Sequence, residues 1–126
     1  MKMLLVIDKI EKDPYIPKLL LLKGRHKEKN LQVTLDLPEK LQDIVEFKEG
    51  EEVEVELSKE KISDVGGKDL YMHGYVLLKE KRGSKVTLQI SIHGLMLRIT
   101  SSVPEYSKEL TSFSEFEKVY VLFRRK

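Results

Sequence analysis

The chain has 126 residues and no cysteine, and 35% of its residues are charged, yet its formal net charge is only +2. The length indicates one domain over residues 1–126, the lack of cysteine excludes disulfides and thiolate metal sites, and the balanced charge argues against a strongly basic nucleic-acid clamp. No apolar run is long enough to cross a bilayer as a helix, and the first residues do not form a signal peptide, so we expect a cytoplasmic protein with no membrane partner.

Apolar runs of strand length predict β-structure in the N-terminal half of the chain. The expected strands cover residues 3–10, 18–25, 31–37 and 51–57, with a proline-containing turn over residues 13–17 and a charged loop over residues 23–30. The second strand carries leucine on both faces at residues 19–22, so two of these four leucines must point outward. Pro38 suits the first position of a helix, so residues 38–45 can form one short helical turn.

The stretch from residue 70 to residue 99 organises the C-terminal half. Two apolar runs, 70–78 and 86–99, flank seven polar residues centred on Gly83, which predicts an antiparallel hairpin. Gly74 falls on the inner face of the first run, together with Leu78, where a missing side chain lets another strand approach or the strand bend. The apolar parity of the second run shifts by one residue near His93-Gly94, which predicts a β-bulge. This assignment leaves Tyr71, His73, Tyr75, His93, Met96 and Arg98 on the outer face.

The last quarter of the chain adds a connection and a closing strand. Residues 100–114 are expected to be loop-like because Pro104 limits strand pairing, and residues 118–124 to form the strand. Roughly seven or eight strands without a long helical period predict an all-β fold, namely an OB-type closed antiparallel β-barrel with at most one short helical turn.

Three segments resemble a known family. His73-Gly74-Tyr75-Val76, the later Ile92-His93-Gly94-Leu95-Met96-Leu97-Arg98-Ile99, and the closing Val119-Tyr120-Val121-Leu122-Phe123-Arg124-Arg125 resemble the motifs of the small OB-type subunit of cellular RNA polymerases. In archaea it is known as the G subunit, and its counterpart is shared by the nuclear polymerases of eukaryotes. His93 replaces a glycine of the eukaryotic members, and their acidic insertion is missing, so the resemblance favours the archaeal branch. The Lys- and Glu-rich composition with one Asn and three Gln indicates a hyperthermophilic source.

The resemblance implies a non-catalytic accessory subunit of the archaeal DNA-dependent RNA polymerase that docks on and braces the largest subunit. Tyr, Met and Arg with few acidic neighbours are typical of the centre of a protein interface. We therefore expect a partner-binding face made of Tyr71, His73, Tyr75, His93, Gly94, Met96 and Arg98. The alternative is that the segment from residue 100 to residue 116 folds over this face and buries it.

A second interpretation is a free-standing OB barrel that binds single-stranded nucleic acid. Such proteins combine a basic groove with stacked aromatic side chains. The candidate phosphate contacts are Lys23, Arg25, Lys27, Arg124 and Arg125. The outward glutamates of the strand at residues 51–57 would repel phosphate, so this interpretation ranks second.

The sequence holds no arrangement that predicts an enzyme. No set of residues has assignable acid, base and nucleophile roles. The three histidines, His26, His73 and His93, lack the spacing of metal ligands, although His73 and His93 can be neighbours across the central hairpin. We therefore expect no cofactor, no metal and no small-molecule substrate.

Overall fold

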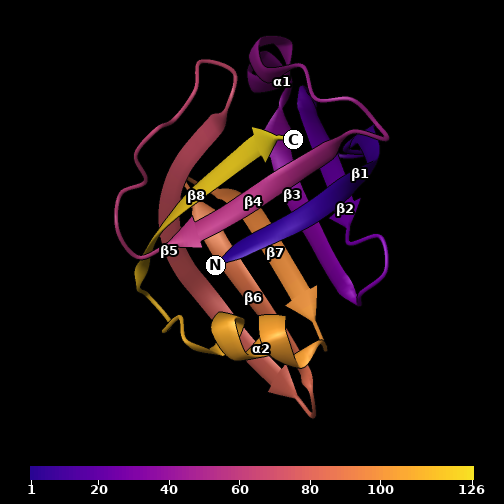
Figure 1. Ribbon diagram of the computed structural model, residues 1–126. Coiled ribbons are helices and arrows are strands. Elements are labelled where there is room, and N and C mark those ends of the chain that lie inside the picture. Colours follow the sequence, from indigo (N-terminus) through magenta and orange to yellow (C-terminus); the bar gives the residue numbers. More distant parts are fainter.

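The computed structural model describes residues 1–126 as eight antiparallel strands closed into a barrel, with two short helices (Figure 1). The strands are β1 (Lys2–Lys12), β2 (Leu19–Arg25), β3 (Leu31–Pro38), β4 (Glu52–Ser58), β5 (Leu70–Arg82), β6 (Lys85–Ile92), β7 (Leu95–Ser101) and β8 (Lys118–Arg125). The helices are α1 (Glu39–Val45) and α2 (Pro104–Thr111). The order around the barrel is β1-β2-β3-β7-β6-β5-β8-β4. The predicted all-β, closed antiparallel barrel is confirmed.

Strict alternation of apolar and polar residues builds the barrel core. In β4, Val53, Val55 and Leu57 are buried while the intervening glutamates are partly exposed, as the period of two requires. The same pattern fills the interior from β3 and β6, and one continuous cluster of buried side chains results. Two of the four leucines in β2 were expected to point outward. Leu20 and Leu21 are half-buried, so neither is fully exposed to solvent.

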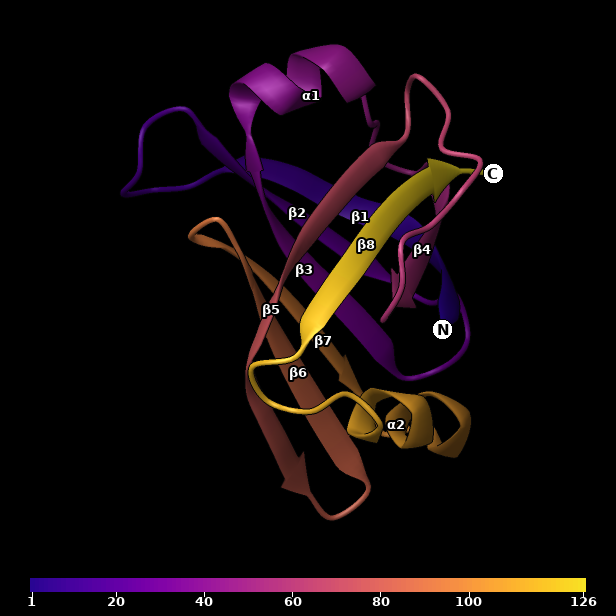
Figure 2. The same ribbon diagram turned by 90° about the vertical axis from the view of Figure 1, so that its left-hand side faces the viewer.

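The hairpin formed by β5 and β6 is longer and tighter than expected. β5 continues to Arg82, which pairs with Lys85 across the turn at Gly83-Ser84, so the predicted seven-residue loop is wrong. Charged residues can pair here because the end of the hairpin projects beyond the barrel (Figure 2), where polar side chains meet water. The pairing register shifts between Val76 and Leu78, and this bulge leaves Leu78 exposed instead of inward.

The predicted bulge at His93-Gly94 is also wrong, because these residues form the turn of a second hairpin. β6 and β7 pair up to Ile92 and Leu95, and the two residues between them have φ angles of 51° and 88°. Positive φ at both positions is the signature of a type I′ turn, the preferred two-residue connection of a hairpin. Ile92 and Leu95 share a face because they pair directly, and the parity of the sequence therefore shifts there.

Gly94 is expected to resist replacement by a β-branched residue. A side chain at φ 88° is strained, although an added Cβ would meet no atom within 4 Å. We expect Gly94→Val to lower the free energy of unfolding by about 1–3 kcal/mol, measured by thermal or denaturant unfolding. Unchanged stability of this variant would show that the turn tolerates another backbone conformation.

The segment after β7 is a helix, so the expected loop over residues 100–114 is corrected. Pro104 occupies the first turn of α2, where its fixed φ is favourable and its missing N–H costs no hydrogen bond. Leu110 and Phe113 are buried and close one end of the barrel, where α2 packs on β6 and β7 (Figure 2). Because α2 caps the barrel end, residues 100–116 do not bury the outer face of β5, and Tyr75 remains 53% exposed.

Helix α1 matches the expected helical turn, with Pro38 at its N-cap position. The barrel thus has two short helices where the sequence predicted one. Neither is long and apolar enough to span a membrane.

Candidate partner-binding surface

Aromatic and histidine rings gather on the outer face of β5 and β8. His73 pairs with Tyr120, and Tyr71 stacks on the ring of Tyr120 with centroids 6.2 Å apart. His93, from the β6–β7 turn, meets His73 edge to face with ring centroids 5.1 Å apart. The expected proximity of His73 and His93 is therefore confirmed. We call Tyr71, His73, His93 and Tyr120 the aromatic–histidine cluster.

Two contacts show what this cluster does within the chain. The phenolic oxygen of Tyr71 accepts a hydrogen bond of 2.9 Å from the backbone N–H of Ile62, which fixes the long connection between β4 and β5. The ammonium of Lys118 lies 5.3 Å from the centre of the Tyr120 ring. The two imidazoles form an edge-to-face aromatic contact. No group of three or more His, Asp or Glu side chains is placed to hold a metal ion.

A second row of outer-face residues crosses β5, β6 and β7. Tyr75 pairs with Ser91, and Ser91 pairs with Met96, so these three side chains lie in one line on one face. Met96 is half-buried, and its backbone N–H donates a 3.0 Å hydrogen bond to the carboxylate of Asp36. Arg98 lies two positions further along β7 on the same face and is exposed. The structure therefore brings the predicted partner-binding residues onto one continuous face, with Gly94 in the adjoining turn.

The sequence missed an exposed apolar surface beside this row. The bulge exposes Leu77 (48%) and Leu78 (37%), and Phe116 is 76% exposed. Phe116 lies beside this part of β5, because its N–H donates to the carbonyl of Val76 at 2.7 Å. We call Tyr75, Leu77, Leu78 and Phe116 the apolar ridge. Contiguous exposed apolar residues are uncommon on monomeric proteins and mark interaction sites.

The sequence indicates some of the unpredicted residues of this surface better than others. Tyr120 alternates with buried Val119 and Val121, so its outward position could have been inferred from parity. The adjacent leucines Leu77 and Leu78 break the alternation of apolar and polar residues, which is a weaker indication of the bulge. The exposure of Phe116 could not be inferred from the sequence, because this residue lies in a turn with φ 68° and outside any alternating strand.

Each of the five basic residues that are candidate phosphate contacts forms an ion pair with a carboxylate. The pairs are Lys23–Glu11 at 2.7 Å, Arg25–Asp8 at 3.2 Å, Lys27–Glu52, Arg124–Asp69 at 3.2 Å and Arg125–Glu51 at 2.9 Å. The hydrogen bond and charge of Lys27 lower the pKa of Glu52, and those of Lys23 lower the pKa of Glu11. These carboxylates therefore stay ionised at neutral pH, and each lies beside its basic partner.

This pairing leads to a prediction about nucleic acid. Contacts to phosphate give affinity through release of counterions, which requires cations free to make them. We expect the isolated chain to bind single-stranded oligonucleotide no tighter than roughly 10⁻⁴ to 10⁻⁶ M at physiological salt. Fluorescence anisotropy with a labelled oligonucleotide measures this. A sub-micromolar complex with a steep salt dependence would make the nucleic-acid interpretation the better one.

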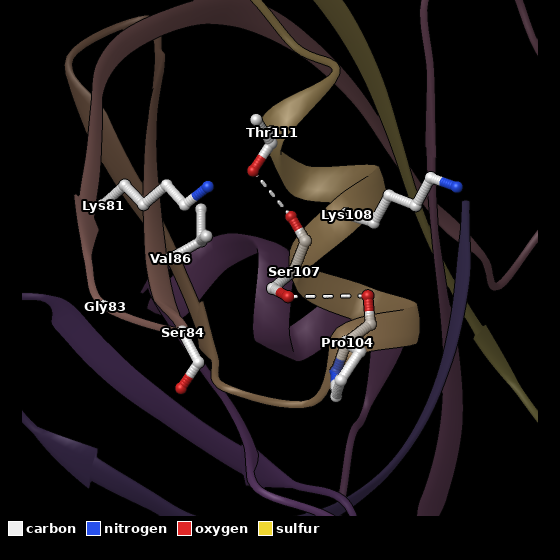
Figure 3. Close-up of a pocket in the computed structure, with 8 residues that line it drawn as sticks. All are labelled: Lys81, Gly83, Ser84, Val86, Pro104, Ser107, Lys108 and Thr111. Atoms are coloured by element: carbon white, nitrogen blue, oxygen red, sulfur yellow. Dashed lines mark hydrogen bonds between the residues drawn. The ribbon is translucent and has the colours of Figure 1, made fainter.

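A cleft of about 420 Å³ lies between the β5–β6 hairpin and α2 (Figure 3). Its lining consists of Lys81, Gly83, Ser84, Val86, Pro104, Ser107, Lys108 and Thr111. The hydroxyls of Ser107 and Thr111 donate to carbonyls within α2, and Lys108 points away from Lys81. The lining holds no histidine or carboxylate that could act as a general base toward a hydroxyl.

Comparison with known proteins identifies a family that matches the whole chain. The family of the G subunit of DNA-directed RNA polymerase matches residues 1–126. No curated protein matches the sequence. Among solved structures, the cytoplasmic molybdate-binding protein ModG is 10% identical, with a TM-score of 0.36 over 98% of this chain and 89% of that chain.

Proposed function

This chain belongs to the family of the G subunit of DNA-directed RNA polymerase, and from that premise we propose that it is a non-catalytic accessory subunit of an archaeal enzyme. In this proposal the barrel docks on the largest subunit in the cytoplasm and braces it, away from the site of nucleotide addition. The composition, rich in Lys and Glu, supports a hyperthermophilic source.

The outer face of β5 and β7 is the observation that carries the docking proposal. Tyr75 and Arg98 are exposed there beside half-buried Met96, and Arg98 has no carboxylate partner within the chain. Tyr, Arg and Met are enriched where protein interfaces are most buried. Exposed side chains without partners in the free protein can form contacts that stabilise a complex with a partner.

Bracing of the largest subunit follows from mass action. A subunit that binds only the folded form of its partner raises the stability of that form in proportion to the logarithm of its concentration over the dissociation constant. The barrel needs no chemistry of its own for this role. Its rigidity, provided by the closed sheet and continuous core, keeps the docking face preorganised.

Affinity purification of the tagged chain from its source cells tests the proposal. We expect the remaining subunits of the polymerase to co-elute, with the largest subunit retained longest as salt is raised. Recovery of the chain alone, or with nucleic acid as its only partner, would contradict the proposed function.

A further inference from the structure

Strand β5 has an unpaired edge beyond the point where β8 begins. β5 pairs with β8 only through Leu70–Tyr75, and the next residue, Val76, is bonded to the backbone of Phe116 and Glu117. From Leu77 to Arg82 the strand pairs with β6 alone, and Figure 2 shows this part of the hairpin extending past β8. A six-residue strand edge is therefore open to solvent.

Open strand edges are usually protected, and this one is protected only in part. A bulge at Leu77, together with Lys79 and Lys81, is the kind of feature that prevents unspecific edge pairing. The apolar ridge nevertheless begins at the same edge, with Leu77 in the strand and Phe116 in the adjoining turn. A leucine and a phenylalanine exposed together at a strand edge are typical of an interaction site.

The charges around the edge indicate the chemistry of that partner. Three lysines form no ion pair, namely Lys79, Lys81 and Lys118, and Glu115 is the one carboxylate here without one, because Glu80 pairs with Arg82 at 3.2 Å and Glu117 with Lys59 at 3.5 Å. The ammonium of Lys79 binds the carbonyl of Thr111 at 2.9 Å, and Lys79 and Lys81 pair with inward-facing Leu88 and Val86, so both lysines lie on the α2 side of the strand. A segment that lies along this edge meets net positive charge and is favoured when it is acidic.

We propose that the edge of β5 from Leu77 to Arg82 receives an extended segment of another polymerase subunit as an added β-strand. The segment carries an apolar side chain against Leu77 and Phe116 and acidic side chains toward Lys79 and Lys81. Main-chain hydrogen bonds of the added strand supply affinity, and the alternate side chains supply specificity. This inference rests on the proposed function and adds the mode of binding and the chemistry of the bound segment.

Hydrogen exchange of backbone amides tests the added strand directly. The chain is measured alone and after reconstitution with purified polymerase that lacks this subunit. In the free chain, amides of residues 77–82 that face the open edge exchange rapidly, and we expect assembly to slow them by about 100-fold or more. Assembly without any slowing at residues 77–82 overturns the added strand and leaves the proposed function standing. Failure of the unmodified chain to assemble overturns both.

Paired variants test the chemistry of the segment. We expect Leu77→Glu and Lys81→Glu each to weaken binding to the same polymerase by about tenfold or more, and the loss with Lys81→Glu to shrink at high salt. The controls are Ile44→Glu and Lys40→Glu on α1, where Ile44 is 61% exposed and Lys40 has no ion pair. Equal effects of the β5 variants and their α1 controls would show that no acidic, apolar segment is bound at this edge.

Discussion

Replacing Gly74 by valine is expected to destabilise the barrel more than any outer-face substitution. A Cβ at this position would lie 2.2 Å from the carbonyl oxygen of Ser91 and 2.9 Å from a side-chain carbon of Ile92. The Ser91 carbonyl belongs to the backbone of the neighbouring strand, so it cannot move aside without breaking the β5–β6 pairing. We expect Gly74→Val to cost about 3 kcal/mol or more, measured as a fall in the denaturant midpoint.

Gly67 provides the matched control for this variant. An added Cβ there would meet no atom within 4 Å, and its φ lies outside the range that disfavours side chains. We expect Gly67→Ala to change the free energy of unfolding by less than about 1 kcal/mol, since only the entropy of the unfolded chain is affected. If Gly74→Ala changed the free energy of unfolding as little as Gly67→Ala, the backbones of β5 and β6 would not approach as closely as the structure shows.

The second large effect is expected on assembly instead of folding. Arg98 is exposed and Met96 is half-buried, so the double change Met96→Ala and Arg98→Ala should leave the barrel folded. At the centre of an interface each truncation costs about 2 kcal/mol of binding, so the pair should weaken assembly with the polymerase by roughly 10³-fold. Circular dichroism checks folding, and reconstitution with polymerase lacking this subunit checks assembly.

Leu88 is the inward-facing control for the double variant. Its side chain is fully buried in β6, and Leu88→Ala should lower the free energy of unfolding by about 2–5 kcal/mol. Unfolding of the Met96 and Arg98 double variant would assign these residues to the core. Normal assembly of a folded double variant would place the docking surface elsewhere, with the apolar ridge as the next candidate.

The alternation of apolar and polar residues predicted most of the barrel because its period depends only on local geometry. Parity alone placed Val53, Val55 and Leu57 inward and Tyr71, His73 and Tyr75 outward. Each strand buries only one face, so shifting the assignment by one residue would move all of its apolar side chains to the outside. The parity of residues 70–76 was therefore as predictable as that of a regular strand.

Connections were less predictable, because the same residues serve several local structures. His93-Gly94 shifts the parity of the sequence whether it forms a bulge or a hairpin turn, and only the pairing of Ile92 with Leu95 decides between them. Pro104 excludes a central strand but also favours the first turn of a helix, and burial of Leu110 makes the helix stable here. These choices depend on tertiary contacts that periodicity does not contain.

Side-chain pairing across the barrel could not be foreseen either. Arg124 and Arg125 appeared as free cations at the end of the sequence, yet they pair with Asp69 and Glu51, far away along the chain. The exposure of Phe116 likewise depends on a left-handed turn that no motif announces. The sequence therefore located the outer face, while the structure added the apolar ridge and the carboxylate partners of the basic residues.

A photo-crosslinking amino acid in place of Tyr75 tests most directly the claim that this barrel docks through the outer face of β5. The assembled polymerase is irradiated, and the subunit joined to the barrel is identified by mass spectrometry. The same amino acid in place of Ile44, on α1, is the control. We predict a crosslink from position 75 to the largest subunit and none from position 44. A crosslink to that subunit from position 44 but not from position 75 would contradict the proposed docking face.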